Sequence, residues 1–372
     1  MSGKNLRHGY TTGACAAAAA KGAALMLRDR QPVAAVELLL PAGMTAAFHL
    51  NSCELQGGTA ICSVIKDAGD DPDVTNGAEI RAELSLVPGE NGSIVVAGGE
   101  GVGRVTKPGL AVAVGDWAIN PIPRRMIEAA VREVFPPDSS PLTPHVVVSI
   151  PNGGELAKKT LNARLGIIGG LSILGTTGIV RPISAKAWTD TIDASIDVAL
   201  ACGSRTVVLS TGRTSEMVAQ RYFGTGDWDP RGPKGPGNGN PLKEEAFVMM
   251  GDHVGYALRA CARKGVGRAV LAGQFAKLLK IACCHEQTHV TSSELDLRAL
   301  ASWLAETPHS SLLTSHVREA NTARQVLEMS GDQPALVALV CSHAAAFARQ
   351  VTPTLPVTVL LAGYGGEVLY CA

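Results

Sequence analysis

The sequence predicts an α/β protein of two domains. A two-layer α/β sandwich is expected over residues 1–186, followed by a Rossmann-like three-layer α/β/α domain over residues 187–372. Three observations support this class. The chain has 372 residues, 46% of them apolar, which is enough for two cores. Its first half carries strand-like runs between turn residues, whereas its second half alternates helical and strand-like segments.

The sequence pattern of the first half predicts a sheet and two helices. An alanine-rich run after Tyr10 predicts an N-terminal helix that Thr11 or Thr12 caps, with Cys15 as a packing residue. A second helix is predicted over residues 120–135, where prolines follow Asn120 and apolar residues recur at helical spacing. Gly, Pro and Asn turns separate four runs typical of an antiparallel sheet: AAVELLLP (34–41), TAAFHL (45–50), AICSVIKDAG (60–69) and EIRAELSLVP (79–88).

The second half alternates helices and strands, which predicts a parallel, doubly wound sheet. Three helices between residues 293 and 350 complete the domain. Residues 224–241 are too rich in Gly and Pro for a helix or strand and are expected to form a loop or lid. The alternating segments are a helix over 189–203, a strand over 206–211, a helix from Ser215, a strand over 246–251, a helix from Asp252, a strand over 268–273 with another helix after it, and closing strands over 356–363 and 366–370.

The charge balance indicates which classes of partner the protein binds, and the cysteine content indicates its compartment. The 33 basic and 33 acidic residues cancel, so the basic stripe typical of nucleic-acid binding is not expected. Nine cysteines at apolar positions such as Cys202, Cys261 and Cys341 indicate reduced thiols. No signal-peptide core and no run of about 18 apolar residues stand out. We therefore expect a cytoplasmic protein that binds neither nucleic acid nor membrane.

One short motif, HEQTH at residues 285–289, has the spacing of a zinc peptidase. His285 and His289 would bind zinc from one face of a helix, with Glu286 as the general base. The β-branched and hydroxylic residues that follow support a helix poorly. A zinc metallopeptidase therefore stays as an alternative to a polar loop without metal.

Two further stretches of the first half combine glycine with basic side chains. GGEGVG (98–103) resembles a dinucleotide fingerprint, but RVTKPG after it does not open a helix. The basic residues after it either clamp a carboxylate or turn a hairpin. Residues 150–184 suit either a large flat ligand with acidic edges or a buried strand pair with solvated lysines. Their polar residues are Lys158, Lys159, Asn162, Arg164 and Arg181.

Three predicted strands of the second half end in small or polar residues. Ligands of open α/β sheets bind at the carboxyl ends of the strands, where helix starts also offer N–H groups. This edge is the candidate cofactor site, and the alternative is that residues such as Ser215 and Asp252 only cap helices. The strand ends are Thr211–Arg213, Gly251–His253 and Gly273–Gln274.

Taken together, these segments resemble the cobalt-precorrin-5B C1-methyltransferase family of anaerobic cobalamin biosynthesis. After residue 215 the resemblance is thinner: the family's Gly-His-x-Gly-Lys loop reads Gly-Gln-Phe-Ala-Lys at 273–277, and its Thr-His pair corresponds to Thr288 and His289, with Glu294 five residues on. The motifs that carry the resemblance are GYTTGACAAAAAKGA (9–23), GGEGVGRVTKPGL (98–110), AINPIPRRMI (118–127), IPNGGELAKKTLN (150–162) and LGIIGGLSILGTTGIVRP (165–182).

The resemblance implies an activity and its ligands. S-adenosyl-L-methionine would methylate C1 of cobalt-precorrin-5B, a cobalt-containing tetrapyrrole, to give cobalt-precorrin-6A. The resemblance also implies that neighbouring pathway enzymes hand over the ring to this protein. It indicates no oligomeric state. A non-catalytic tetrapyrrole-binding protein is the second alternative. An electron-rich ring carbon that attacks a methyl sulfonium needs two ligands held in contact and shielded from water more than it needs a strong base.

The same resemblance suggests site residues but no catalytic group. Basic side chains would bind the carboxylates of the ring, and free N–H groups at the first helix start would bind one more. Glycine-rich backbone in GGLSILGTTG would lie against the face of the ring. The predicted substrate-binding residues are Tyr10, Thr11, Thr12, Arg104, Lys107, Asn120, Arg124, Lys158, Asn162, Arg164, Thr176, Thr177 and Arg181. The predicted S-adenosylmethionine-binding residues are Thr211, Gly212, Arg213, Glu216, Gly251, Asp252, Gly273 and Lys277, with Glu216 or Asp252 as the ribose acceptor.

Overall fold

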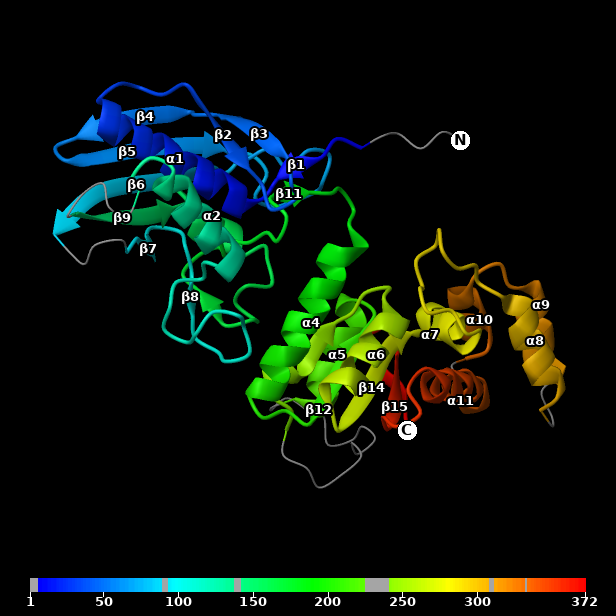
Figure 1. The fold of residues 1–372 in the computed structure, drawn as a ribbon. Helices are drawn as coiled ribbons and strands as arrows, with labels where there is room; N and C mark the ends of the chain where they lie inside the picture. Colours follow the sequence, from blue (N-terminus) through cyan, green and yellow to red (C-terminus); the bar gives the residue numbers. More distant parts are fainter. Residues whose placement is uncertain (1–5, 89–92, 137–141, 225–240, 308–310, 332) are drawn as a thin grey trace. The chain divides into compact units, whose positions relative to one another are not determined.

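The computed structural model describes the chain except for residues 1–5, 89–92, 137–141, 225–240, 308–310 and 332. It divides into two compact units, Met1–Ser184 and Ala185–Ala372 (Figure 1). Both units contain helices and strands, so the α/β class is confirmed. The predicted loop over 224–241 falls almost entirely outside the described residues.

The first unit is built on a five-stranded sheet in the order β4-β5-β6-β9-β7. Neighbouring strands are antiparallel except β7 and β9, which are parallel, and β2 and β3 form a separate antiparallel pair. The strands are β2 (Ala35–Leu39), β3 (Thr45–His49), β4 (Ser52–Gln56), β5 (Thr59–Ile65), β6 (Glu79–Pro88), β7 (Val95–Gly98) and β9 (Leu142–Ser149).

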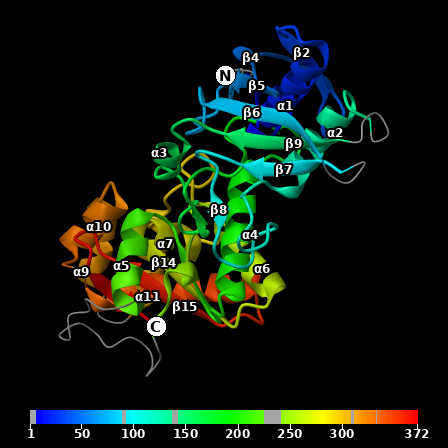
Figure 2. The ribbon, with the colours of Figure 1, turned by 90° about the vertical axis from the view of Figure 1, so that its left-hand side faces the viewer.

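Two helices, α1 (Thr12–Asp29) and α2 (Pro121–Arg132), pack against each other, and α1 packs on β5 and β6 (Figure 2). The alanines of α1 from Ala16 to Ala20 are fully buried, because small side chains let the helix approach the sheet closely. Burial raises the pKa of the Cys15 thiol to about 12, so this residue stays an uncharged packing group.

Short elements complete the first unit around its glycine-rich segments. β1 pairs with β11, and β8 pairs with β10, both antiparallel. The predicted alternative of one strand pair within 150–184 is therefore wrong, since each short strand of that stretch pairs with a segment outside it. The elements are β1 (Gly9–Tyr10), β8 (Arg104–Val105), α3 (Gly153–Ala157), β10 (Ile167–Ile168) and β11 (Ile179–Val180).

The second unit contains a five-stranded sheet in the order β13-β12-β14-β15-β16. The first four strands are parallel to their neighbours, and β16 runs antiparallel to β15. Parallel pairing brings the carboxyl ends of these strands to one edge. The strands are β12 (Thr206–Ser210), β13 (Phe247–Met249), β14 (Arg268–Gln274), β15 (Val357–Ala362) and β16 (Val368–Cys371).

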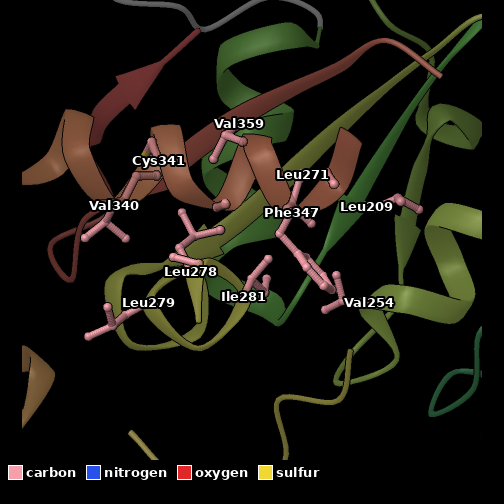
Figure 3. Close-up of a cluster of buried hydrophobic side chains, with 14 of the residues drawn as sticks. Leu209, Val254, Leu271, Leu278, Leu279, Ile281, Val340, Cys341, Phe347 and Val359 are labelled. Carbon is pink, nitrogen blue, oxygen red and sulfur yellow. The ribbon is translucent and has the colours of Figure 1, made fainter. Parts of the chain in front are cut away.

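Helices cover both faces of this sheet. Side chains from α6, α7 and α11 pack with Leu209, Leu271 and Val359 on one face (Figure 3). On the other face, Val218 of α5 packs with strand residues such as Val270. The helices are α4 (Ala185–Ala201), α5 (Arg213–Phe223), the 3₁₀ turn η1 (Glu244–Ala246), α6 (Val254–Lys264), α7 (Phe275–Ala282), α8 (Leu297–Ala305), α9 (Ser311–Glu319), α10 (Ala323–Met329) and α11 (Pro334–Val351).

Two sequence predictions need correction here. Four helices, α8 to α11, occupy the stretch where three were expected, because Thr322 caps a new helix by accepting a hydrogen bond from Gln325 N (3.1 Å). The helix expected from Asp252 begins at Val254, with His253 as its first flanking residue.

The helix α11 is long and apolar enough, within the described ranges, to cross a membrane by length and composition. Its apolar side chains Leu336, Val337, Val340 and Phe347 are nevertheless buried in the core of the second unit. Such burial is what a core helix shows.

Candidate functional site

Segments from separate motifs of the first unit meet in a web of backbone hydrogen bonds. Leu171 N donates to Gly101 O (2.8 Å), and Gly103 N donates to Leu171 O (2.9 Å). Ala118 N donates to Gly103 O (2.8 Å), and Ile173 N donates to Ala118 O (2.8 Å). Hydrogen bonds therefore join three separate stretches of the first unit, around Gly101, Ala118 and Leu171.

The glycines of this web leave no room for a side chain. A Cβ on Gly170 would lie 2.2 Å from Gly101 O, and one on Gly153 would lie 2.3 Å from the same oxygen. A Cβ on Gly175 would lie 2.4 Å from the Thr11 side chain. Close packing against Gly101 and Thr11 is therefore enough to explain why Gly170 and Gly175 have no side chain, and the contact of this backbone with a ligand stays a prediction.

The start of α1 is bound into the same web. Thr11 Oγ1 accepts a hydrogen bond from Ala14 N (3.2 Å), and Gly13 N donates to Leu174 O (3.0 Å). Leu174 N in turn donates to Thr12 Oγ1 (2.9 Å). The expected free N–H groups are therefore already occupied at Gly13 and Ala14. Thr11 and Thr12 are buried and hold the 172–178 segment in place.

Arg104 is an exposed basic residue of the web whose side chain is fixed in position. Its guanidinium lies 3.8 Å from the centroid of the Trp117 ring, and Nη1 donates to Gly115 O (2.7 Å). Ile168, which pairs with Arg104 across β8 and β10, is 51% exposed, and Val114 is 55% exposed. Charge and apolar surface therefore adjoin here. Trp117 was not predicted from the sequence as a site residue, although it lies one residue before the 118–127 motif.

The remaining predicted substrate residues fall into two groups. Several are held by the backbone: Asn162 Nδ2 donates to Gly170 O (3.2 Å), Arg124 Nη1 to Val96 O (3.0 Å) and Lys107 Nζ to Arg164 O (3.3 Å). Tyr10 packs on Phe48 with ring centroids 4.5 Å apart, and Asn120 N donates to Ile173 O (3.0 Å). The exposed group consists of Lys158, paired with Glu155, and of Thr176, Thr177 and Arg181.

In the second unit, the predicted cofactor residues from adjacent strand ends are neighbours. Thr211 N donates to Ala272 O (3.0 Å), next to Gly273. Ser210 O accepts hydrogen bonds from Met250 N (3.0 Å) and Gly251 N (3.2 Å). Gly212 caps α5, which begins at Arg213. The structure thus brings this predicted edge together.

Asp252 is the charged centre of the edge. Its Oδ1 accepts hydrogen bonds from the Lys277 ammonium and from Thr288 Oγ1 (2.5 Å). Burial alone would raise the pKa of Asp252, but the hydrogen bonds from Lys277 and Thr288 lower it below its ordinary value. Within the described ranges, Oδ2 accepts no hydrogen bond. Asp252 therefore offers a charged acceptor that is still open.

Two lysines of α7 hold the loop that carries Thr288. Lys277 Nζ donates to Thr288 O (3.2 Å), and Lys280 Nζ donates to Thr288 O (3.1 Å) and Ser293 O (2.8 Å). Lys280 is 9% exposed, and burial lowers its pKa. Lys280 was not predicted from the sequence, because a buried lysine has no pattern of its own. Glu216, the other predicted ribose acceptor, is 7% exposed and thus less accessible than Asp252.

The HEQTH segment does not form the helix that a zinc peptidase needs. Glu286 Oε1 accepts a hydrogen bond from Arg259 Nη1 (2.9 Å), and His289 Nδ1 lies 2.8 Å from Thr291 Oγ1. In the part of the chain that the structure describes, no three His, Cys, Asp or Glu side chains group as metal ligands. The described residues therefore do not form the helical zinc site that a zinc peptidase needs.

These features place the chain among α/β proteins with a polar carboxyl edge on a parallel sheet. A family profile described as CbiD matches residues 1–182, and one described as CbiD, C-terminal domain, matches residues 287–372. The chain belongs to the CbiD family.

Named relatives and one solved structure extend this comparison. The cobalt-precorrin-5B C(1)-methyltransferase of Geotalea daltonii is 63% identical over 98% of this chain and 98% of its own length. The protein of the same name from Geobacter sulfurreducens is 64% identical over 100% of this chain and 99% of its own. A crystal structure of a cobalamin biosynthesis protein (cbiD) from Archaeoglobus fulgidus is 29% identical, covers 74% of this chain and 79% of that one, and has a TM-score of 0.38.

The glycine web yields a stability prediction. Gly170→Ala should lower the free energy of unfolding of the first unit by about 3 kcal/mol, since its Cβ would meet backbone atoms that do not move aside cheaply. Gly58→Ala is the matched control, because nothing lies within 4 Å of its Cβ position, and it should change that free energy by less than about 0.5 kcal/mol. Urea unfolding followed by circular dichroism measures both, and equal effects would contradict the packing argument.

Proposed function

We propose that this chain transfers a methyl group from S-adenosyl-L-methionine to C1 of cobalt-precorrin-5B in cobalamin biosynthesis. The observation that carries the proposal is full-length identity of 63–64% to relatives named for that reaction. The products are cobalt-precorrin-6A and S-adenosylhomocysteine. The compartment we propose is the cytoplasm, where neighbouring enzymes of the pathway would hand over the ring.

The two units take separate roles in this proposal. The first, as a two-layer α/β sandwich, binds the cobalt-precorrin, and the second, as a Rossmann-like three-layer domain, binds S-adenosylmethionine. In support, the resemblance motifs of the first unit converge on one web, and the second unit has helices on both faces of a mostly parallel sheet. Ligands of such sheets bind at the carboxyl edge.

Arg104 is the substrate contact with the best support in the first unit. The ring carries carboxylates around an apolar macrocycle, and Arg104 offers a positioned guanidinium beside exposed Ile168 and Val114. Because Trp117 and Gly115 O already fix this side chain, little rotamer freedom is lost on binding. The exposed Thr176, Thr177 and Arg181 provide further polar contacts.

The carboxyl edge of the second unit fits S-adenosylmethionine. A ribose offers two hydroxyl donors, and Asp252 Oδ2 is a charged acceptor without a partner in the described residues. Lys277 and Thr288 hold the other oxygen, so the carboxylate is fixed in orientation. Residues at Thr211, Gly212 and Gly273 leave the adjacent strand ends free of large side chains.

The reaction requires the protein mainly to position its two ligands. S-adenosylmethionine supplies an electrophilic methyl group whose bond to sulfur breaks, with its electron pair staying on sulfur, as ring carbon C1 bonds to the methyl carbon. The nucleophile belongs to the substrate, so no side chain needs to form a covalent bond. The residues of this chain bind the two ligands, orient them and exclude water.

Methyl transfer is tested directly with isotopically labelled S-adenosylmethionine and cobalt-precorrin-5B. The expected result is a tetrapyrrole that gains the mass of one labelled methyl group, measured by mass spectrometry, together with S-adenosylhomocysteine. A ring that binds but gains no mass would instead identify a non-catalytic tetrapyrrole-binding protein.

Substitution of Arg104 tests the substrate surface. Arg104→Ala should raise KM for the cobalt-precorrin about tenfold and leave kcat nearly unchanged, because it removes a charge-assisted contact made equally in ground and transition states. Arg28→Ala removes another exposed arginine, paired with Asp29, and should leave both constants unchanged. A loss in kcat alone, at unchanged KM, would rule out this role.

Asp252 is tested by calorimetry with S-adenosylmethionine. Asp252→Asn and Asp252→Ala should each weaken binding about tenfold or more, since a hydrogen bond to a charged acceptor is lost. Asp190→Ala, which removes an exposed carboxylate paired with Lys186, is the control and should bind normally. Unchanged affinity in Asp252→Ala would exclude Asp252 as the ribose acceptor.

A further inference from the structure

Trp188 is an exposed aromatic side chain with no role in the site described above. It lies in the first turn of α4 and is 45% exposed. Its indole Nε1 donates to Met250 O (2.9 Å), directly after β13. One edge of the ring is therefore fixed at the same strand end that leads to Asp252.

Gly251 makes room for this ring. Its backbone has φ +59°, and a Cβ there would lie 2.9 Å from Cζ2 and 3.1 Å from Nε1 of Trp188. A residue with a side chain would therefore meet both backbone strain and the indole. Since Asp252 is the next residue, the indole of Trp188 contacts the turn that carries the open carboxylate.

His253 supports the ring without adding charge. The two ring centroids are 6.3 Å apart with an interplanar angle of 27°. His253 Nδ1 lies 2.7 Å from Gln287 Nε2, which donates to it and so favours the uncharged imidazole. Burial lowers the pKa of His253, although the charge of Asp252 acts in the opposite direction. The hydrogen bond from Gln287 and the burial of His253 therefore both favour the uncharged form of this aromatic surface.

The other tryptophans of the described residues already have a partner stacked on the ring. Trp303 stacks on His343 with centroids 3.9 Å apart, and Trp117 is covered by Arg104 at 3.8 Å. The ring of His253, which is the aromatic partner of Trp188 among the described residues, lies at the longer centroid distance of 6.3 Å. Trp188 thus combines a fixed edge with a ring that is still open to a flat ligand.

We infer that Trp188 is the surface on which the adenine ring of S-adenosylmethionine stacks, next to the ribose at Asp252. The inference rests on the proposed function and adds to it a residue that binds the base. Stacking on an aromatic side chain recognises a purine through its π face, and the edge hydrogen bond to Met250 O holds the indole in place before the ligand arrives.

Calorimetry with S-adenosylhomocysteine, adenosine and methionine tests the stacking. Trp188→Ala should weaken binding of S-adenosylhomocysteine and adenosine about 10- to 100-fold, whereas Trp188→Phe, which keeps an aromatic face, should weaken it less than about fivefold. Binding of methionine should not differ between the variants. Met217→Ala, which removes another exposed apolar side chain of this unit, should bind like the wild type.

Tryptophan fluorescence gives a second readout that needs no turnover. S-adenosylhomocysteine should quench the emission of the wild type, and Trp188→Phe should remove this quench while its melting temperature stays unchanged. The fluorescence result decides the matter even where Trp188→Ala folds poorly. A quench that persists in Trp188→Phe, or wild-type affinity in a folded Trp188→Ala, would overturn the stacking alone. A wild type that binds neither S-adenosylmethionine nor S-adenosylhomocysteine would overturn the proposed function as well.

Discussion

The first unit depends on the close approach of backbones around the carbonyl oxygen of Gly101. That oxygen accepts a hydrogen bond from Leu171 N, and the Cα atoms of Gly153 and Gly170 close in on it without room for a Cβ. The 150–162 and 165–182 motifs are thereby fixed against the 98–110 motif. Arg104, three residues beyond Gly101, owes its position to this contact, as does Ile168 on the paired strand.

The sequence predicted those elements whose periodicity is long and uninterrupted. The helices α1 and α2 and the strands β2, β3, β5 and β6 lie where they were expected. The strands β4, β7 and β9 were missed. β9 carries Pro144 inside its run, which argues against a central strand. β9 nevertheless lies between β6 and β7 in the sheet, and its side chains Val146 and Val148 are fully buried. Its partners, which the sequence does not reveal, override the local signal.

Residue types at the sites were easier to predict than their surroundings. Thr11 and Thr12 were correctly placed at a helix start, but only the fold reveals that Leu174 and the 172–178 segment bury them. Asp252 meets Lys277 and Thr288 from 25 and 36 residues away, contacts that tertiary packing alone creates. Trp188 gave no sequence signal, because its role arises from the missing Cβ of Gly251.

The two oxygens of Asp252 have different roles, because Oδ1 is bound by the protein and Oδ2 is open to the proposed ligand. A carboxylate with both oxygens paired would serve only to join loops, and one with neither paired would rotate freely. Here Lys277 and Thr288 take Oδ1, which links α7 and the Thr288 loop to the end of β13 and keeps the group ionised. The open Oδ2 is thus held in one orientation on the turn that the indole of Trp188 contacts through Met250 and Gly251, so that a base and its sugar would find a flat apolar surface and a charged acceptor at one strand end.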